Sequence, residues 1–324
     1  MIDFRYHIVS LISVFLALAV GIALGAGPLK ETIEESLTGQ VARLRSEKEA
    51  LRAEATAARQ ALNDERAFID QAAADLLTDR LLNRQVAVVV LGEVPAETLE
   101  AIEARLTQAG ASVTGQATLT EAWTDPSQRS FRTGIAGTLA DYIAGSGQTE
   151  TTEQVLAAAV IYGLVNADAT DPGRLSTSAS AVLGILTSGS SDNPLVRLDG
   201  DITVPADSVI VVAPPRSPSG TAASPPPDDV QGALLAVAVA AQAGSAGAVL
   251  VDGARGSGSL VEVLLADRSL QGTVTTVSGM DSMSAPVVVP MALAAQIAGH
   301  VGHYGFGSDK TVLPPTVTLP EADD

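Results

Sequence analysis

The sequence contains no cysteine among its 324 residues, which excludes both a disulfide framework and a thiolate metal site. Histidine is scarce, with three copies. The catalytic motifs G-x-S-x-G, H-E-x-x-H and Walker A are absent as well. We therefore expect a protein that is not an enzyme, and one for which the sequence identifies no cofactor with certainty.

Basic residues are also few, with 19 Lys and Arg against 37 Asp and Glu, which gives a formal net charge of −18. A chain this acidic is repelled by nucleic acid and by anionic lipid surfaces. Nucleic acid is thus excluded as the main partner, whereas a cationic ligand is compatible with the charge.

Residues 8–26 carry no charge and are long enough to cross a bilayer once, because a transmembrane helix needs about 20 apolar residues. A cleaved signal peptide is the alternative, but the run is longer than usual for one. Arg5 precedes the segment, and Lys30 among several glutamates follows it. The basic bias predicts cytoplasmic residues 1–7, a single pass through the plasma membrane, and the bulk of the chain outside the cytoplasm.

Small residues recur every fourth position within this segment. Such a stripe lets two helix backbones approach closely and predicts a helix–helix interface in the bilayer. The alternative is that alanine and glycine are simply abundant in this chain. The predicted interface residues are Ser13, Ala17, Gly21 and Gly25.

Residues 30–82 follow a heptad pattern rich in Glu, Arg and Ala, which predicts a coiled-coil stalk and a homodimer. Lys48 and Glu65 occupy core positions and weaken the seam. A single amphipathic helix folded back on the rest of the chain is the alternative. The predicted seam residues are Leu37, Val41, Leu44, Leu51, Leu62 and Ile69.

From residue 84 the pattern changes to buried strands alternating with helices. An apolar strand at 86–91, a helix at 95–108 and a strand at 111–117 predict a βαβ unit, and hence parallel pairing. We expect a doubly wound Rossmann-like or flavodoxin-like α/β domain over 84–308. Its other predicted strands are 195–198, 209–213, 248–251 and 274–277, and its other helices are 131–144, 153–166, 179–187, 231–243, 260–265 and 291–301.

Three segments of this region carry no regular pattern. Residues 214–229 are too rich in Pro and Ser to pack and predict an exposed loop. Residues 309–324 predict a disordered acidic tail. The glycine-rich residues 253–259 follow a strand, where backbone amides can hold a phosphate, although a plain strand-to-helix loop with Asp252 as a helix cap is the simpler interpretation.

Two pairs of side chains suit a soft metal. Met280 and Met283 are three residues apart, as are His300 and His303, and thioether and imidazole groups suit copper, with methionine favouring Cu(I). The alternative is that the methionines lie in a loop or fill the core and that the histidines form a polar helix end. These four residues are accordingly the candidate ligands for copper.

The opening residues resemble those of a known protein family. Asp3-Phe4-Arg5-Tyr6-His7-Ile8-Val9-Ser10-Leu11, followed by the apolar run at 14–25, resembles the start of the actinobacterial copper transport protein B (MctB-like) family. The heptad region, the valine strand and the closing residues 302–305 fit the same layout. The resemblance implies a role in copper homeostasis, as a channel-forming envelope protein that moves copper out of the cell.

Two functions therefore remain. One is a copper transport or copper homeostasis component of the cell envelope. The other is a non-catalytic dimeric scaffold that links a cytosolic partner to envelope or cell-division machinery. A barrel pore fits poorly, because aromatic residues make up 3% of the chain and its strands do not alternate in polarity.

Overall fold

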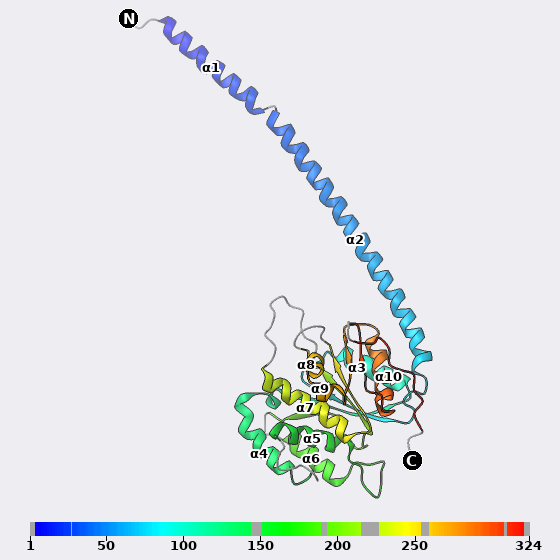
Figure 1. Ribbon diagram of the computed structural model, residues 1–324. Coiled ribbons are helices and arrows are strands. Elements are labelled where there is room, and N and C mark those ends of the chain that lie inside the picture. The colour runs from blue at the N-terminus through cyan, green and yellow to red at the C-terminus, as the bar shows by residue number, and fades with distance from the viewer. Residues whose placement is uncertain are drawn as a thin grey trace. The chain divides into compact units, whose positions relative to one another are not determined.

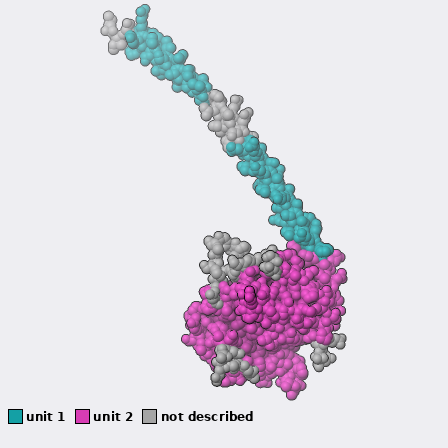
Figure 2. Space-filling view, in the orientation of Figure 1, with its two compact units in different colours: residues 1–68 teal, residues 69–324 magenta. Residues whose placement is uncertain are grey.

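The computed structural model describes residues 4–26, 28–143, 151–188, 193–214, 227–253, 259–307 and 310–320, with the backbone alone for 26, 28–38 and 228. The chain divides into two compact units, residues 1–68 and 69–324, which Figure 2 draws in different colours. Most of the Pro-rich segment predicted at 214–229 and of the glycine-rich segment predicted at 253–259 lies outside the described residues.

The first unit begins with helix α1, Phe4–Ala26, which contains the predicted membrane span. The candidate membrane span within it, Phe4–Gly25, would be roughly 33 Å long at 1.5 Å per residue, enough to cross the hydrocarbon core. None of it is buried against the rest of the described chain, which distinguishes it from the core helix of a globular domain. The hydroxyl of Ser13 donates to the carbonyl of Val9 at 2.7 Å and so needs no partner from lipid. A signal sequence near the N-terminus also passes this test of length and hydropathy, so retention of the helix stays a prediction.

Helix α2, Pro28–Leu77, runs through the predicted stalk as 50 continuous helical residues, roughly 75 Å at 1.5 Å per residue. Pro28 occupies the first helical position, where its missing N–H costs nothing. The apolar seam residues Leu44 and Leu51 are 64% and 65% exposed in the single chain. The helix is thus confirmed, whereas the coiled coil and the dimer stay predictions, and the side chain of Leu37 lies outside the described residues.

The end of α2 belongs to the second unit, which corrects the predicted start of the α/β domain at residue 84. Ala73, Leu77 and Leu81 are fully buried in the domain core, and Ile69 packs against the same cluster. The carboxylate of Asp70 also pairs with Arg105 of helix α3, Ala96–Gln108. The heptad pattern assigned Ile69 to the seam, because an apolar stripe looks the same whether it faces a second helix or a domain core.

One seven-stranded sheet forms the centre of the domain, in the order β3-β2-β1-β4-β5-β6-β7. The predicted βαβ unit is confirmed, because β1 and β2 pair in parallel around α3. All other neighbours are parallel except β2 and β3. The strands are β1 Gln85–Val90, β2 Ser112–Leu119, β3 Val196–Asp199, β4 Ser208–Ala213, β5 Ala248–Asp252, β6 Thr275–Ser278 and β7 His303–Tyr304.

Helices cover both faces of the sheet, as Figure 1 shows. Alternate residues of β1 point to opposite faces: Val86 and Val88 pack with α3 and α10, whereas Ala87 and Val89 pack with the cluster that holds α4 to α8. Burial on both sides is why this strand is a continuous apolar run. The remaining helices are α4 Arg129–Leu139, α5 Thr152–Val165, α6 Thr177–Ser188, α7 Asp228–Gly244, α8 Leu260–Ala266, α9 Arg268–Gln271 and α10 Ala285–Ile297, with short 3-10 helices η1 Glu121–Trp123 and η2 Pro126–Gln128.

Helix α10 is displaced from its predicted position at 291–301. It begins at Ala285 because Pro286 is tolerated in the first turn, and it continues through Pro290. It ends at Ile297, ahead of Gly299 with a φ of +84°. The two-residue strand β7 then follows, which is too short to leave a periodic signal in the sequence.

The acidic tail predicted to be disordered is ordered over its described part, residues 310–320. Val317 and Leu319 pack against the core cluster that contains residues of α3 and α10. Arg80 and Arg84 donate from Nη1 and Nη2 to the carbonyls of Val317 and Pro320, both at 3.1 Å. Proline content misled the prediction, because these apolar side chains find a partner that composition cannot reveal.

Candidate functional site

The two candidate metal-binding pairs lie at opposite ends of α10. Met280 and Met283 lie in the turn between β6 and α10, where the amide of Met280 donates to the carbonyl of Asp252 at 3.3 Å. His300 and His303 follow the other end of the helix, whose 13 residues span roughly 20 Å. The four residues therefore do not form one site. Within the described residues no group of three or more His, Asp or Glu side chains could hold a metal ion, and copper binding by either pair stays a prediction.

Both ring nitrogens of His303 already have partners. Nε2 lies 3.1 Å from the carbonyl of Gln271, which can only accept, so Nε2 carries the proton. Nδ1 then accepts from the hydroxyl of Thr276 at 3.0 Å. A metal ion would have to displace one of these bonds, which makes His303 a poorer ligand than its spacing from His300 indicates.

Partial burial of His303 lowers the pKa of its imidazole, and the nearby charge of Lys310 adds to this, while the bond to Gln271 opposes it. The unfolded chain then binds a proton more readily than the folded chain, so stability should be greatest above the ordinary pKa of 6.5 and should fall as the pH drops below it. We expect the His303→Gln variant to lose part of this dependence.

Urea unfolding followed across the acid range tests this expectation. The His300→Gln variant is the matched control, because His300 is exposed and lies three residues away. Equal slopes of stability against pH in the wild type and in His303→Gln would contradict the assignment.

The predicted bilayer interface remains open in the single chain. A Cβ atom added at Gly21 or Gly25 would meet no atom of the chain within 4 Å. This leaves room for a second helix but does not identify one, so the role of Ser13, Ala17, Gly21 and Gly25 stays a prediction.

The described ends of the glycine-rich loop cap helix α8. The hydroxyl of Ser259 accepts from the amide of Glu262 at 3.1 Å. A carboxylate oxygen of Asp252 accepts from the amide of Val261 at 3.4 Å. The bond of Asp252 supports its capping interpretation, and Ser259 is a second cap of the same helix, while residues 254–258 lie outside the described chain.

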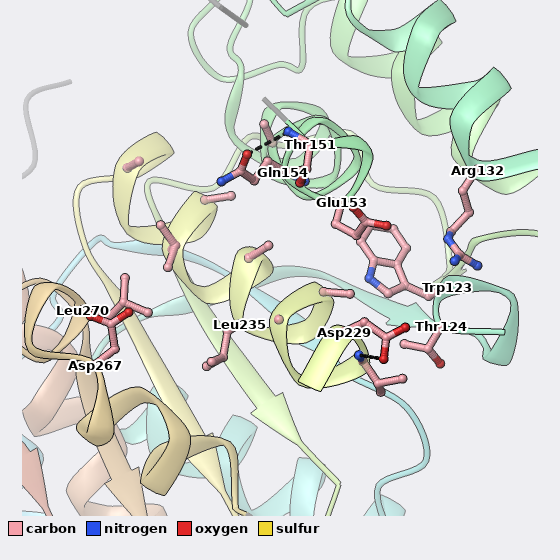
Figure 3. A pocket seen from close by; sticks show the side chains of 18 of the residues that line it. Trp123, Thr124, Arg132, Thr151, Glu153, Gln154, Asp229, Leu235, Asp267 and Leu270 are labelled. Atoms are coloured by element: carbon pink, nitrogen blue, oxygen red, sulfur yellow. Dashed lines mark hydrogen bonds between the residues drawn. The ribbon is translucent and has the colours of Figure 1, made fainter. Parts of the chain in front are cut away.

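A cavity of about 710 Å³ is the feature that sequence reasoning missed (Figure 3). Helices α5 and α7 form its floor, and η1 and α9 contribute its ends. No motif marks it, because its lining is scattered over the segments from 123 to 270. The apolar part of the lining includes Trp123, Ala158, Leu235, Ala236, Val239, Ala240 and Leu270.

A buried arginine stands at one end of this cavity. Arg132 is 5% exposed and Trp123 is 1% exposed. Nη1 of Arg132 donates to the carbonyls of Ala122 and Asp125 at 3.0 and 2.7 Å. Its buried Nε has no hydrogen-bond partner, and both bonds of the guanidinium to described residues come from Nη1. Arg132 thus fastens the turn at 122–125 and retains unused donors.

Most other charged groups of the cavity already have partners within the protein. Asp229 lies 3.7 Å from Arg129 in an exposed ion pair. Asp267, at the opposite end in Figure 3, accepts bonds from Ser269 that lower the pKa of its carboxyl. Glu153 lies in the first turn of α5, where the helix dipole stabilises its charge. No carboxylate of the described chain comes within 4.0 Å of Arg132.

Comparison with known proteins gives consistent similarities over nearly the whole chain. A family model described as "Copper transport outer membrane protein, MctB" matches residues 1–315. The Copper transporter MctB of Mycobacterium tuberculosis is 29% identical over 317 residues, which cover 95% of this chain and 97% of the relative. The Copper transporter MctB of Mycobacterium leprae is 26% identical over 328 residues, which cover 99% and 100%.

Proposed function

This chain belongs to the MctB family of copper transport outer membrane proteins, and from that premise we propose that it acts in copper homeostasis of the cell envelope. We place it in the plasma membrane as a single-pass protein, with residues 1–7 in the cytoplasm and the α/β domain outside. The family match over residues 1–315 carries the copper assignment. The apolar length of α1 supports the membrane assignment.

In this role copper is cargo and not a resident cofactor. The pair Met280 and Met283 is the better candidate for contact with it, because both thioethers lie in a surface turn and neither is fully buried. One transmembrane helix cannot line a pore by itself, so we infer that copper is handed on by a complex. The strand order supports a Rossmann-like domain, and we propose that this domain has no catalytic role.

Replacing Met280 and Met283 together by leucine should weaken Cu(I) binding at least about tenfold, as substitutions at metal sites commonly do. Leucine keeps the volume and removes the sulfur. Cu(I) titration of the full-length protein against a competing chelator measures the effect, and cellular copper in a Mycobacterium strain without its own MctB measures its consequence.

Met291→Leu is the matched control, because Met291 is buried in α10 and offers its sulfur to no solvent. Unchanged affinity in the Met280→Leu, Met283→Leu double variant would remove these residues from the copper pathway. Unchanged cellular copper after expression of the wild type would count against the copper assignment as a whole.

The exposed seam of α2 favours a second function, that of a dimeric scaffold between cytosolic and envelope proteins. Val41, Leu44, Leu51 and Leu62 are all exposed in the single chain and repeat at heptad spacing. Exposed leucines at this spacing are costly unless a second helix covers them. We propose a parallel homodimer through this seam.

Cysteines introduced at Leu44 and Leu51 should form disulfide-linked dimers in membranes, since residues at a d position face their equivalents in a parallel pair. The chain has no native cysteine to compete. Ser46→Cys, on the outer side of the same heptad, is the control. Monomers alone, or equal crosslinking at Ser46, would rule out this seam.

A further inference from the structure

We propose that the cavity between α5 and α7 binds an elongated apolar molecule with an anionic head group, a carboxylate or a phosphate. Its volume of about 710 Å³ lies within the range of small-molecule sites. Copper ions do not need such a space, so the cavity serves something beyond the cargo of the family.

The shape of the lining selects an elongated ligand. Residues from Asp229 to Ala243 of α7 contribute to the cavity, a stretch of roughly 21 Å along the helix. Between these ends the floor consists of apolar side chains, with Ala236 and Ala240 only partly covered by the protein. An apolar trough of this length suits an alkyl or isoprenoid chain, because burial of such a chain removes apolar area from water on both sides.

The charges select the head group and its position. Arg129 and Arg132 are the only basic residues among the described lining, and both lie at the Trp123 end. Arg132 is a buried cation that bonds to two carbonyls and to no carboxylate, and the charge of Asp125 interacts with it without an ion pair. A buried cation that forms no ion pair retains part of its desolvation penalty, and an anionic group that accepts from Nη2 would reduce that penalty. The N-termini of α5 and α7 also lie at this end and favour an anion, while Glu153 opposes it.

Binding can be measured by the fluorescence of Trp123, since it is the only tryptophan of the chain and lines the cavity. The full-length protein is reconstituted in phosphatidylcholine vesicles and titrated with 2-bromoundecanoate, whose bromine lies next to the head group and quenches the emission of Trp123 on close approach. Matched probes carry a phosphate, a neutral alcohol or a trimethylammonium head. We expect saturable quenching by the carboxylate or the phosphate probe, at least about tenfold weaker with the other two, as for loss of one charge-assisted hydrogen bond. The relative affinities of the two anionic probes distinguish a free fatty acid from a phosphorylated lipid.

Two variants test the two halves of the proposal. Ala236→Phe should abolish quenching by every probe, because its ring fills the trough without touching Arg132. Arg132→Met should weaken the anionic probes at least about tenfold and leave the neutral probe unchanged, whereas Arg268→Met, a nearby exposed arginine outside the cavity, should change neither. If Arg132→Met does not fold, as judged by its Trp123 emission, the Ala236→Phe variant and the head-group series still decide.

Quenching that persists in Ala236→Phe, or that never saturates, would place the probe in the bilayer and overturn the proposal. Equal affinity for anionic, neutral and cationic heads would overturn the anion site. A folded Arg132→Met variant with unchanged affinity would overturn the part assigned to Arg132 and leave it with the single role of fastening the turn at 122–125.

Discussion

Arginine at both Phe15 and Leu18 should abolish the membrane association of this protein. Both side chains are exposed near the middle of α1. Each arginine at the centre of a membrane helix costs about 2.5 to 3.5 kcal/mol on insertion scales, so two together outweigh most of the apolar contribution of the helix. The protein recovered in the carbonate-resistant membrane fraction measures the loss.

The Phe15→Leu, Leu18→Ile double variant is the control, because it keeps the segment uncharged and equally long. It should remain in the membrane fraction. A wild-type protein that is extracted by carbonate, or whose mature N-terminus lies near residue 26, would contradict the anchor and support a cleaved signal peptide instead.

Leu77→Ala should destabilise the α/β domain by about 2 to 5 kcal/mol, the usual cost of emptying a fully buried leucine site. Leu77 lies at the end of α2 and is 0% exposed, in the cluster that also contains Val88 and Ile102. Urea unfolding of the full-length protein, followed by the emission of Trp123, measures the change.

Phe68→Ala, at an exposed position of α2 outside the predicted seam, is the matched control and should change domain stability by less than about 0.5 kcal/mol. If the domain began at residue 84, as the sequence pattern predicts, Leu77→Ala would behave like this control. A large effect at Leu77 alone would establish that the helix end is part of the core.

The apolar strands were predictable because burial on both faces requires a continuous run of apolar residues. Such a run can be recognised in the sequence without knowing what it contacts. Residues 86–91 and 248–251 each lie within one residue of the observed strands β1 and β5. The opening residues likewise identified the family. Features that depend on distant contacts were not predictable. The burial of Leu77 is a property of the folded chain and leaves no pattern in the heptads.

The candidate site shows the same division. The spacing in the sequence suggested two metal-binding pairs, Met280 with Met283 and His300 with His303. It could not reveal that α10 separates the two pairs. It also could not reveal that Gln271 and Thr276 occupy the ring of His303. Arg132 went unnoticed for a similar reason, since an arginine in an amphipathic helix is ordinarily a solvated side chain and only the fold buries it.

The bonds from Arg80 and Arg84 to Val317 and Pro320 bring together parts of the chain that are 237 and 236 positions apart. A spectroscopic label near residue 320 would therefore report on the place where α2 gives way to the first strand. A purification tag fused at the same point would emerge beside that junction rather than at a remote corner of the domain.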